Sequence, residues 1–243
     1  LKEALVNKNY TALEKDHSLS SLDGYGNRSI TFLDNHDTGC INRTDCDNLY
    51  SKKLAFHNFF HVIETLKFAN QIVNSLVTKL STLNLETIYY ALLFHDAGYV
   101  ENQTCLGYSD KESYSAALAE EYLLGRGMPL AGVSKVTLAI KATHISAECR
   151  NLEEEVVRGA DISGMAAPYN DFLKMSKAIK AEQEYLIGAK ISWTDWVRGS
   201  EVNLKPYLHE KISCGELFIK SNEPSLFNQR LTSNIKQLKQ EIV

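Results

Sequence analysis

Three separated segments of the chain carry side chains that can bind a divalent cation. They hold His61, the adjacent pair His95 and Asp96, and Asp161. Imidazole nitrogens and carboxylate oxygens suit several such ions, among them Mn²⁺, Fe²⁺, Ni²⁺, Co²⁺, Zn²⁺ and Mg²⁺. Ligands from three segments leave coordination positions open for water and substrate, which is typical of a catalytic site. We therefore expect a metal site suited to the hydrolysis of a phosphate ester.

Other histidines could take part in the same chemistry. His57 precedes His61 by four residues, so on a helix both imidazoles would project from one face, about one turn apart. One could then bind metal while the other meets the substrate. A single histidine in an apolar helix is more often a core residue than a ligand. Histidines and aspartates recur in several helices expected for one domain, however, and this recurrence favours a metal site.

The spacing of apolar residues after about residue 50 predicts an all-α body. We expect helices over residues 51–80, 84–94, 131–145, 151–162, 169–187 and 224–242, and another that Asp110 caps and that closes at Gly125–Arg126–Gly127. His95 and Asp96 would diverge by about 100° on a helix, so both reach one ion only at a helix end. Gly98 is expected to stop the helix there. Small residues from Gly159 to Gly164 would let backbones approach closely around Asp161.

Residues 1–48 differ from the rest, because they are rich in Asp, Asn, Gly, Ser and Thr. We expect an irregular N-terminal arm, with residues 49–243 forming the helical domain. The stretch Asn35–His36–Asp37 resembles a conserved segment of α-amylases, in which His36 and Asp37 would contact the sugar. Glycoside hydrolysis needs a second carboxylate across the scissile bond, and the arm is far too short for a barrel of about 250 residues. Sugar hydrolysis through Asp37 is therefore not expected.

Composition narrows the partners and the compartment. A net charge of −4 and a pI near 6.0 disfavour a nucleic-acid partner but not a nucleotide. No apolar run approaches the roughly 18 residues that span a bilayer, and residues 1–6 lack the apolar region of a signal peptide, so we expect no membrane partner. Scattered cysteines without CxxC spacing indicate a reducing, cytoplasmic location, although Cys40 and Cys46 are close enough to be bridged. A homo-oligomer is compatible with the sequence.

The order of these motifs resembles the HD-domain superfamily of metal-dependent phosphohydrolases, which carry a His, a His-Asp pair and a distant Asp on a helical bundle. The resemblance covers residues 50–240 and is strongest to a branch of predicted HD phosphohydrolases that opens with Tyr-His-Asn-x-x-His. Cyclic-nucleotide phosphodiesterases share this opening. The matching segments are Phe56–His61, Phe94–Tyr99, Asp110–Ala116, Thr143–His144 and Ala160–Ser163. Phe56 replaces a tyrosine, Lys111 an asparagine and Gly159 the first acid of Asp-Ala-Asp, but no ligand is lost.

The resemblance implies a role for each residue of the cluster. His61, His95, Asp96 and Asp161 would hold the metal, and His57 would protonate the leaving oxygen. Asp96 or Asp161 would also orient the attacking water. These roles suit the side chains, because a divalent cation lowers the pKa of bound water and an imidazole titrates close to neutral pH.

Three further residues are candidates for contact with the substrate. His144 and Glu112 would touch the substrate, a second metal or the metal ligands. Lys111 would place a positive charge near the pocket entrance, or would be only a solvated lysine at a helix start. We expect hydrolysis of a phosphomonoester or phosphodiester in a nucleotide or another small phosphorylated metabolite. The alternative is an HD-fold regulatory module that binds metal or nucleotide with little turnover. The presence of His57 argues against it, because such a module needs no proton donor.

Overall fold

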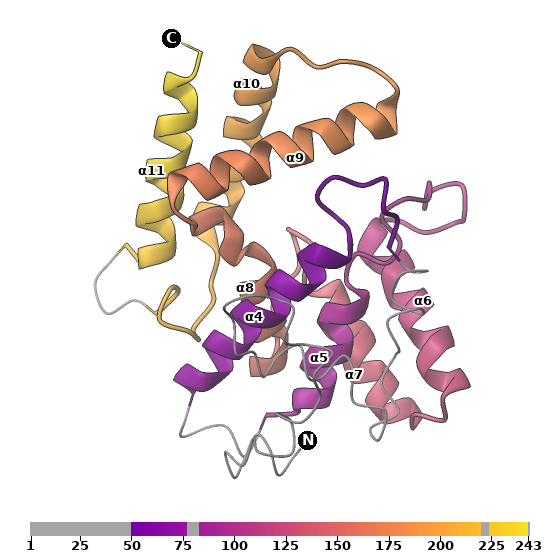
Figure 1. Cartoon of the computed structure of the whole chain (residues 1–243). Helices are drawn as coiled ribbons and strands as arrows, with labels where there is room; N and C mark the ends of the chain where they lie inside the picture. Colours follow the sequence, from indigo (N-terminus) through magenta and orange to yellow (C-terminus); the bar gives the residue numbers. More distant parts are fainter. Residues whose placement is uncertain (1–49, 77–82, 220–223, 243) are drawn as a thin grey trace, which may run out of the picture. The chain divides into compact units, whose positions relative to one another are not determined.

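The computed structural model describes residues 50–76, 83–219 and 224–242, and among them it contains helices but no strand. The helices are α4 (Phe59–Ser75), α5 (Leu85–Phe94), α6 (Lys111–Gly125), α7 (Leu130–Lys141), α8 (Leu152–Ile162), η4 (Ser163–Ala166), α9 (Tyr169–Ile187), α10 (Trp193–Leu204), η5 (Lys205–His209) and α11 (Leu226–Gln240) (Figure 1). All of them belong to one compact unit, Ser51–Val243. The prediction of an all-α body is confirmed for the described residues.

The N-terminal arm expected over residues 1–48, its amylase-like segment, and Cys40 and Cys46 lie outside the described residues. The domain boundary expected between residues 48 and 49 therefore stays a prediction. The other cysteines, Cys105, Cys149 and Cys214, are not in disulfides.

Side-chain caps explain where most of the helices begin. A capping side chain accepts a hydrogen bond from a first-turn backbone N–H, which would otherwise lack a partner. The capping residues are Asn58, Asn84, Asp110, Asn151, Ser192 and Ser225. The predicted cap at Asp110 is confirmed, and α5, α8 and α9 lie within one residue of the limits expected from the sequence.

The prediction of a helix that starts at residue 51 is wrong, because α4 begins only at Phe59. Asn58 caps it, and the backbone N–H groups of His57 and its predecessor donate to the carboxylate of Glu182 instead of entering a helix. His57 therefore lies in a turn before the helix. The expectation that His57 and His61 share one face of a helix is therefore wrong.

Two other helices also differ from expectation. α7 ends at Lys141 rather than at residue 145, because carbonyls of the following segment accept hydrogen bonds from the guanidinium of Arg158. α10 was not among the expected helices. The hydroxyl of Ser192 accepts from the backbone N–H of Asp195 and donates to its carboxylate, which is a capping signal visible in the sequence.

Helix α5 forms the centre of the core. Every residue from Thr87 to Phe94 is buried, and α5 packs against α4, α6, α7 and α8. A helix that is apolar on all sides is expected to be fully buried. The turn that follows it, with His95 and Asp96, is consequently buried as well.

Two glycines allow close approaches around this turn. A Cβ at Gly159, on α8, would lie 3.2 Å from Ile72 of α4, so the small residue lets these two helices approach. A Cβ at Gly98 would lie 2.5 Å from the Tyr114 ring, and the N–H of Gly98 donates to Ser115 on α6. The helix ends at Phe94 with His95 as its C-cap, so Gly98 is not the residue that stops it. Gly98 instead packs the turn after α5 against α6.

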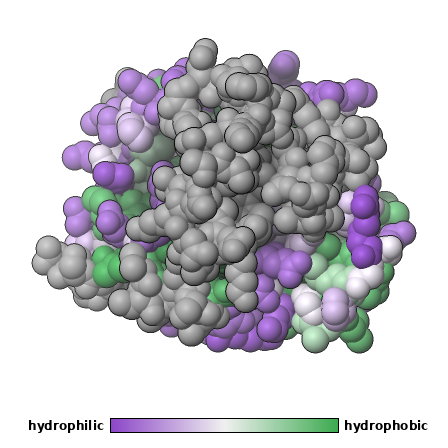
Figure 2. Space-filling view, turned by 60° about the horizontal axis from the view of Figure 1, so that its bottom comes forward, coloured by the Kyte–Doolittle hydropathy of each residue, from purple (hydrophilic) through white to green (hydrophobic). Residues whose placement is uncertain are grey.

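No helix within the described ranges combines the length and the apolar character needed to cross a membrane. On the face shown in Figure 2, hydrophilic and hydrophobic side chains both occur on the described surface.

Candidate metal centre

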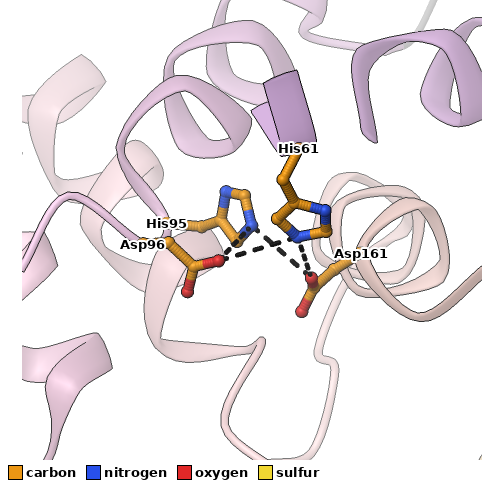
Figure 3. Close-up of side chains that lie close together, drawn as sticks. All are labelled: His61, His95, Asp96 and Asp161. Carbon is orange, nitrogen blue, oxygen red and sulfur yellow. Dashed lines mark ion pairs between the residues drawn. The ribbon is translucent and has the colours of Figure 1, made fainter. Parts of the chain in front are cut away.

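Three elements bring the predicted metal ligands together. His61 is in the first turn of α4, His95 and Asp96 are in the turn after α5, and Asp161 is one residue before the end of α8. One ligand atom from each side chain lies within 4.8 Å of all the others. Figure 3 shows the two imidazoles and two carboxylates converging. This cluster could hold a metal ion.

The separations between the ligand atoms suit a single shared ion. Nε2 of His95 lies 3.1 Å from Oδ2 of Asp96 and 3.5 Å from Oδ1 of Asp161. Nε2 of His61 lies 3.6 Å and 3.4 Å from the same two oxygens. Ligand atoms that are each about 2.0–2.2 Å from one ion lie roughly 3–4 Å from one another.

The hydrogen bonds of His95 indicate which of its ring nitrogens faces the cluster. Nδ1 donates to the carbonyl of Leu92 at 2.7 Å, which assigns a proton to Nδ1. Nε2 is buried and has no hydrogen-bond partner among the described residues. Buried polar atoms nearly always have a partner. A ring nitrogen without one, beside two carboxylates, therefore fits a metal ligand.

The side chains of the cluster shift one another's pKa values. Burial disfavours the charged form of His95, but Asp96 and Asp161 outweigh burial and raise the pKa of His95 to about 10. Burial lowers the pKa of His61. Burial also opposes ionisation of both acids, but His95 and the other nearby donors hold their pKa values well below the usual range. The acids are therefore carboxylates, and an ion bound here would replace a proton on His95.

His57 lies beside the cluster and is held by two neighbours. Its Nδ1 hydrogen-bonds to one carboxylate oxygen of Glu182, and the other oxygen accepts the backbone N–H of His57 at 2.8 Å. The ring stacks on Tyr99, with centroids 3.7 Å apart. Nε2 is 4.0 Å from Oδ2 of Asp96. Because Nδ1 donates to the carboxylate, Nε2 is the nitrogen left to face the cluster.

Glu182 was not identified from the sequence. It lies on α9, 125 residues after His57 in the chain, and its side chain is 1% exposed. Burial opposes ionisation, but the hydrogen bonds with His57 outweigh it and lower the pKa of Glu182. Glu182 follows Phe172 and Ile179 at helical spacing, and all three lie on one side of α9 toward the core or the pocket. A glutamate among apolar residues on one face of a helix is the sequence pattern that could have indicated this buried carboxylate.

Lys111, at the start of α6, reaches the cluster, and Glu112 lies beside it. Nζ of Lys111 donates to Oδ1 of Asp96 at 2.7 Å and lies 4.7 Å from the centre of the Tyr99 ring. Glu112 is buried, and its Oε1 is 3.8 Å from the same Nζ. The side chain of Lys111 is only 33% exposed. The alternative of a merely solvated lysine therefore does not describe its position.

His144 approaches from the turn that follows α7. The backbone N–H of Ser146 donates to its Nδ1, and the hydroxyl of Ser146 is within hydrogen-bond distance of the same nitrogen. Because Nδ1 accepts, the proton of the neutral ring is on Nε2, which can donate to a ligand in the pocket. The guanidinium of Arg158 supports this turn and pairs with Glu210 at 2.5 Å. Arg158 donates to the carbonyls of Ala142, His144, Ile145 and Ala147.

The site opens into a pocket of about 590 Å³, a volume usual for small-molecule sites. Its polar lining includes His57, His61, Lys111, Glu112, His144 and Asp161. Its apolar lining includes Phe56, Met165, Met175, Ile179 and Trp196. Trp196 of α10 and Tyr207 of η5 were not identified from the sequence. Burial raises the pKa of Tyr207 to about 12, so its hydroxyl keeps its proton at neutral pH.

Within the residues that the structure describes, the domain is all-helical and carries a candidate His/Asp metal site. Its fold is similar to that of two solved phosphodiesterase domains. One similar solved structure is the phosphodiesterase domain of Salpingoeca rosetta rhodopsin phosphodiesterase. It has a TM-score of 0.57 and 14% identity, over 82% of this chain and 78% of that chain. A second structure, of the phosphodiesterase domain of the RhoPDE fusion protein from the same choanoflagellate, has a TM-score of 0.56 and 13% identity, over 81% of each chain. The sequence matches no protein-family model and no curated protein.

Proposed function

We propose that this protein is a metal-dependent phosphohydrolase of the HD superfamily. The observation that carries the proposal is the convergence of ligand atoms from His61, His95, Asp96 and Asp161 beside a separately held imidazole, His57. The similarity of the fold to phosphodiesterase domains supports it. The substrate is a phosphomonoester or phosphodiester of a nucleotide or another small phosphorylated metabolite.

The donor set fits a divalent ion of the first transition row, or Mg²⁺. Such an ion supplies Lewis acidity, which activates water and neutralises phosphate charge. Asp161 has an exposed fraction of 23%, the largest among the four ligands' side chains, and it lines the pocket. In the proposed reaction its carboxylate orients the attacking water from the pocket side.

His57 is the proton donor in this proposal. Glu182 holds Nδ1, so Nε2 can deliver a proton to the leaving oxygen. Tyr99 stacks on the ring and limits its rotation. The ammonium of Lys111 and the Nε2–H of His144 would bind phosphate oxygens, and both residues line the pocket.

A metal-loading and hydrolysis screen tests the proposal. The protein is freed of metal with a chelator and reloaded separately with Mn, Mg, Ni, Co or Fe. It is then assayed on generic phosphomonoester and phosphodiester substrates and on nucleotides. We expect metal-dependent release of phosphate or alcohol with at least one ion. Tight nucleotide binding by metal-loaded protein without any turnover would favour the regulatory module instead.

A further inference from the structure

The two carboxylate oxygens of Asp96 face different positive groups. Oδ2 lies 3.1 Å from Nε2 of His95 and 3.6 Å from Nε2 of His61, on the side of the metal cluster. Oδ1 instead accepts a hydrogen bond from Nζ of Lys111 at 2.7 Å. The side chain of Asp96 is 2% exposed, so both oxygens are largely shielded from bulk water. The carboxylate thus bridges the metal cluster and an ammonium.

Asp96 is placed like the carboxylate that bridges the two ions of a two-metal site, with the metal cluster on one side and the ammonium of Lys111 on the other. In two-metal hydrolases the ions lie about 3.5–4 Å apart and clamp the attacking and leaving oxygens, and a carboxylate can give one oxygen to each ion. In this protein Oδ1 of Asp96, the oxygen turned away from the cluster, already binds the ammonium of Lys111. The same ammonium is 3.8 Å from Oε1 of Glu112, a second buried acid.

We propose that Lys111 supplies the second positive charge of this centre, so that the centre takes one divalent ion per chain. The inference rests on the proposed function, because it concerns the same metal site. Removing the ammonium would free Oδ1 of Asp96 and the carboxylate of Glu112, and would open a place for a second ion.

Charge balance supports a single ion. Asp96, Asp161 and Glu112 provide three carboxylates around Lys111 and the cluster. One divalent ion and one ammonium provide three positive charges, while the ligand imidazoles are neutral when they bind metal. A second divalent ion beside Lys111 would leave an excess of positive charge next to Asp96, whose side chain is only 2% exposed, and this is unfavourable.

Lys111 also has hydrogen-bonding capacity left for a substrate. An ammonium has three N–H donors, and Asp96 takes one of them. Lys111 lines the pocket, and its position over the Tyr99 ring restrains the rest of the side chain. Its remaining donors can bind a phosphate oxygen, which is part of the work that a second ion does in a two-metal hydrolase.

The number of bound ions tests this inference without an activity assay. Chelator-treated protein is dialysed to equilibrium against saturating Mn²⁺, and the bound manganese is counted by elemental analysis. Electron paramagnetic resonance then shows whether the bound ions are isolated or magnetically coupled to each other. The proteins are the wild type, Lys111→Ala, the charge-retaining Lys111→Arg, and Lys239→Ala as a control. Lys239 pairs with Glu201 at 3.1 Å and is 52% exposed. Circular dichroism verifies that each variant is folded.

We expect one ion per chain, with the spectrum of isolated Mn²⁺, in the wild type, Lys111→Arg and Lys239→Ala. In Lys111→Ala we expect two ions and an exchange-coupled spectrum. Two ions in the wild type, or one ion in Lys111→Ala, would overturn the inference and leave the proposed function standing. A wild-type protein that binds no metal would overturn the proposed function and this inference together.

Discussion

Glu182 holds His57 through both of its carboxylate oxygens. One oxygen hydrogen-bonds to Nδ1 of the imidazole, and the other accepts the backbone N–H of the same residue at 2.8 Å. The orientation of the candidate proton donor is thus determined by α9, a helix far from it in the sequence. Glu182 is a positioning residue, because it acts on the chemistry only through His57.

Glu182→Gln should lower kcat without removing the metal. An amide can present its NH₂ to Nδ1 and so favour the wrong tautomer of His57, and the loss in kcat should reach at most about 10²–10⁴-fold, the usual contribution of a general acid. Steady-state kinetics combined with metal analysis would measure both properties. Glu201→Gln is the matched control, because Glu201 forms surface ion pairs with Lys205 and Lys239. An unchanged pH profile of kcat in Glu182→Gln would contradict the positioning role.

The same residue should make stability depend on pH. The pKa of Glu182 is lowered from its ordinary value of 4.5 in the folded protein, so its contribution to stability is fully present above that value. It is lost as the pH falls through the lower folded pKa. The difference in melting temperature between the wild type and Glu182→Gln should therefore be larger at pH 7 than at pH 3. A difference that grows on acidification would show that the sign is wrong.

Gly98→Ala should destabilise the protein and weaken metal binding. The added Cβ would lie 2.5 Å from the Tyr114 ring and 3.2 Å from the backbone nitrogen of Ser115. Overpacking of this kind costs about 1–3 kcal/mol, and the strain falls two residues from Asp96. Urea denaturation and metal titration would measure the two effects. Gly125→Ala is the control, because nothing lies within 4 Å of its Cβ and alanine favours a helix.

Arg158→Ala should cost about 3–5 kcal/mol, the range for removing one partner of a buried ion pair. The change leaves Glu210 without its cationic partner and releases the carbonyls of the turn that carries His144. Urea denaturation would measure the loss. Arg158→Lys keeps the positive charge but loses the planar guanidinium that donates to several carbonyls at once, so it should recover only part of the stability. Full recovery by lysine would show that the hydrogen bonds to the carbonyls contribute little.

Most of the helices, and part of the candidate metal cluster, could be predicted because they depend on local signals. The cap at Asp110, the helical limits of α9 and the His95–Asp96 turn before Gly98 follow from residues close in sequence. His61 and Asp161 could be assigned because their motifs keep a fixed order in the family that the chain resembles. That these four candidate ligands converge follows from the packing of α4 and α8 around α5.

Long-range contacts explain the features that the sequence did not predict. The start of α4 was placed too early because a carboxylate on α9 takes the N–H groups before it. The end of α7 was placed too late because Arg158 of α8 takes the carbonyls after it. Helical periodicity within either segment cannot reveal a partner elsewhere in the chain. Two local signals were overlooked: the capping pair of Ser192 and Asp195 at the start of α10, and Glu182 on an otherwise apolar face of α9.

The most direct test of the proposed function compares His57→Ala with Asp96→Ala in metal content and in hydrolysis of the best substrate from the screen. His57 lies outside the ligand cluster, whereas Asp96 belongs to it. We expect His57→Ala to keep its metal and to lose about 10²–10⁴-fold in kcat, the usual contribution of a general acid. Asp96→Ala should lose both metal and activity. An Asp96→Ala protein that retains its metal and hydrolyses the substrate at the wild-type rate would contradict the assigned centre.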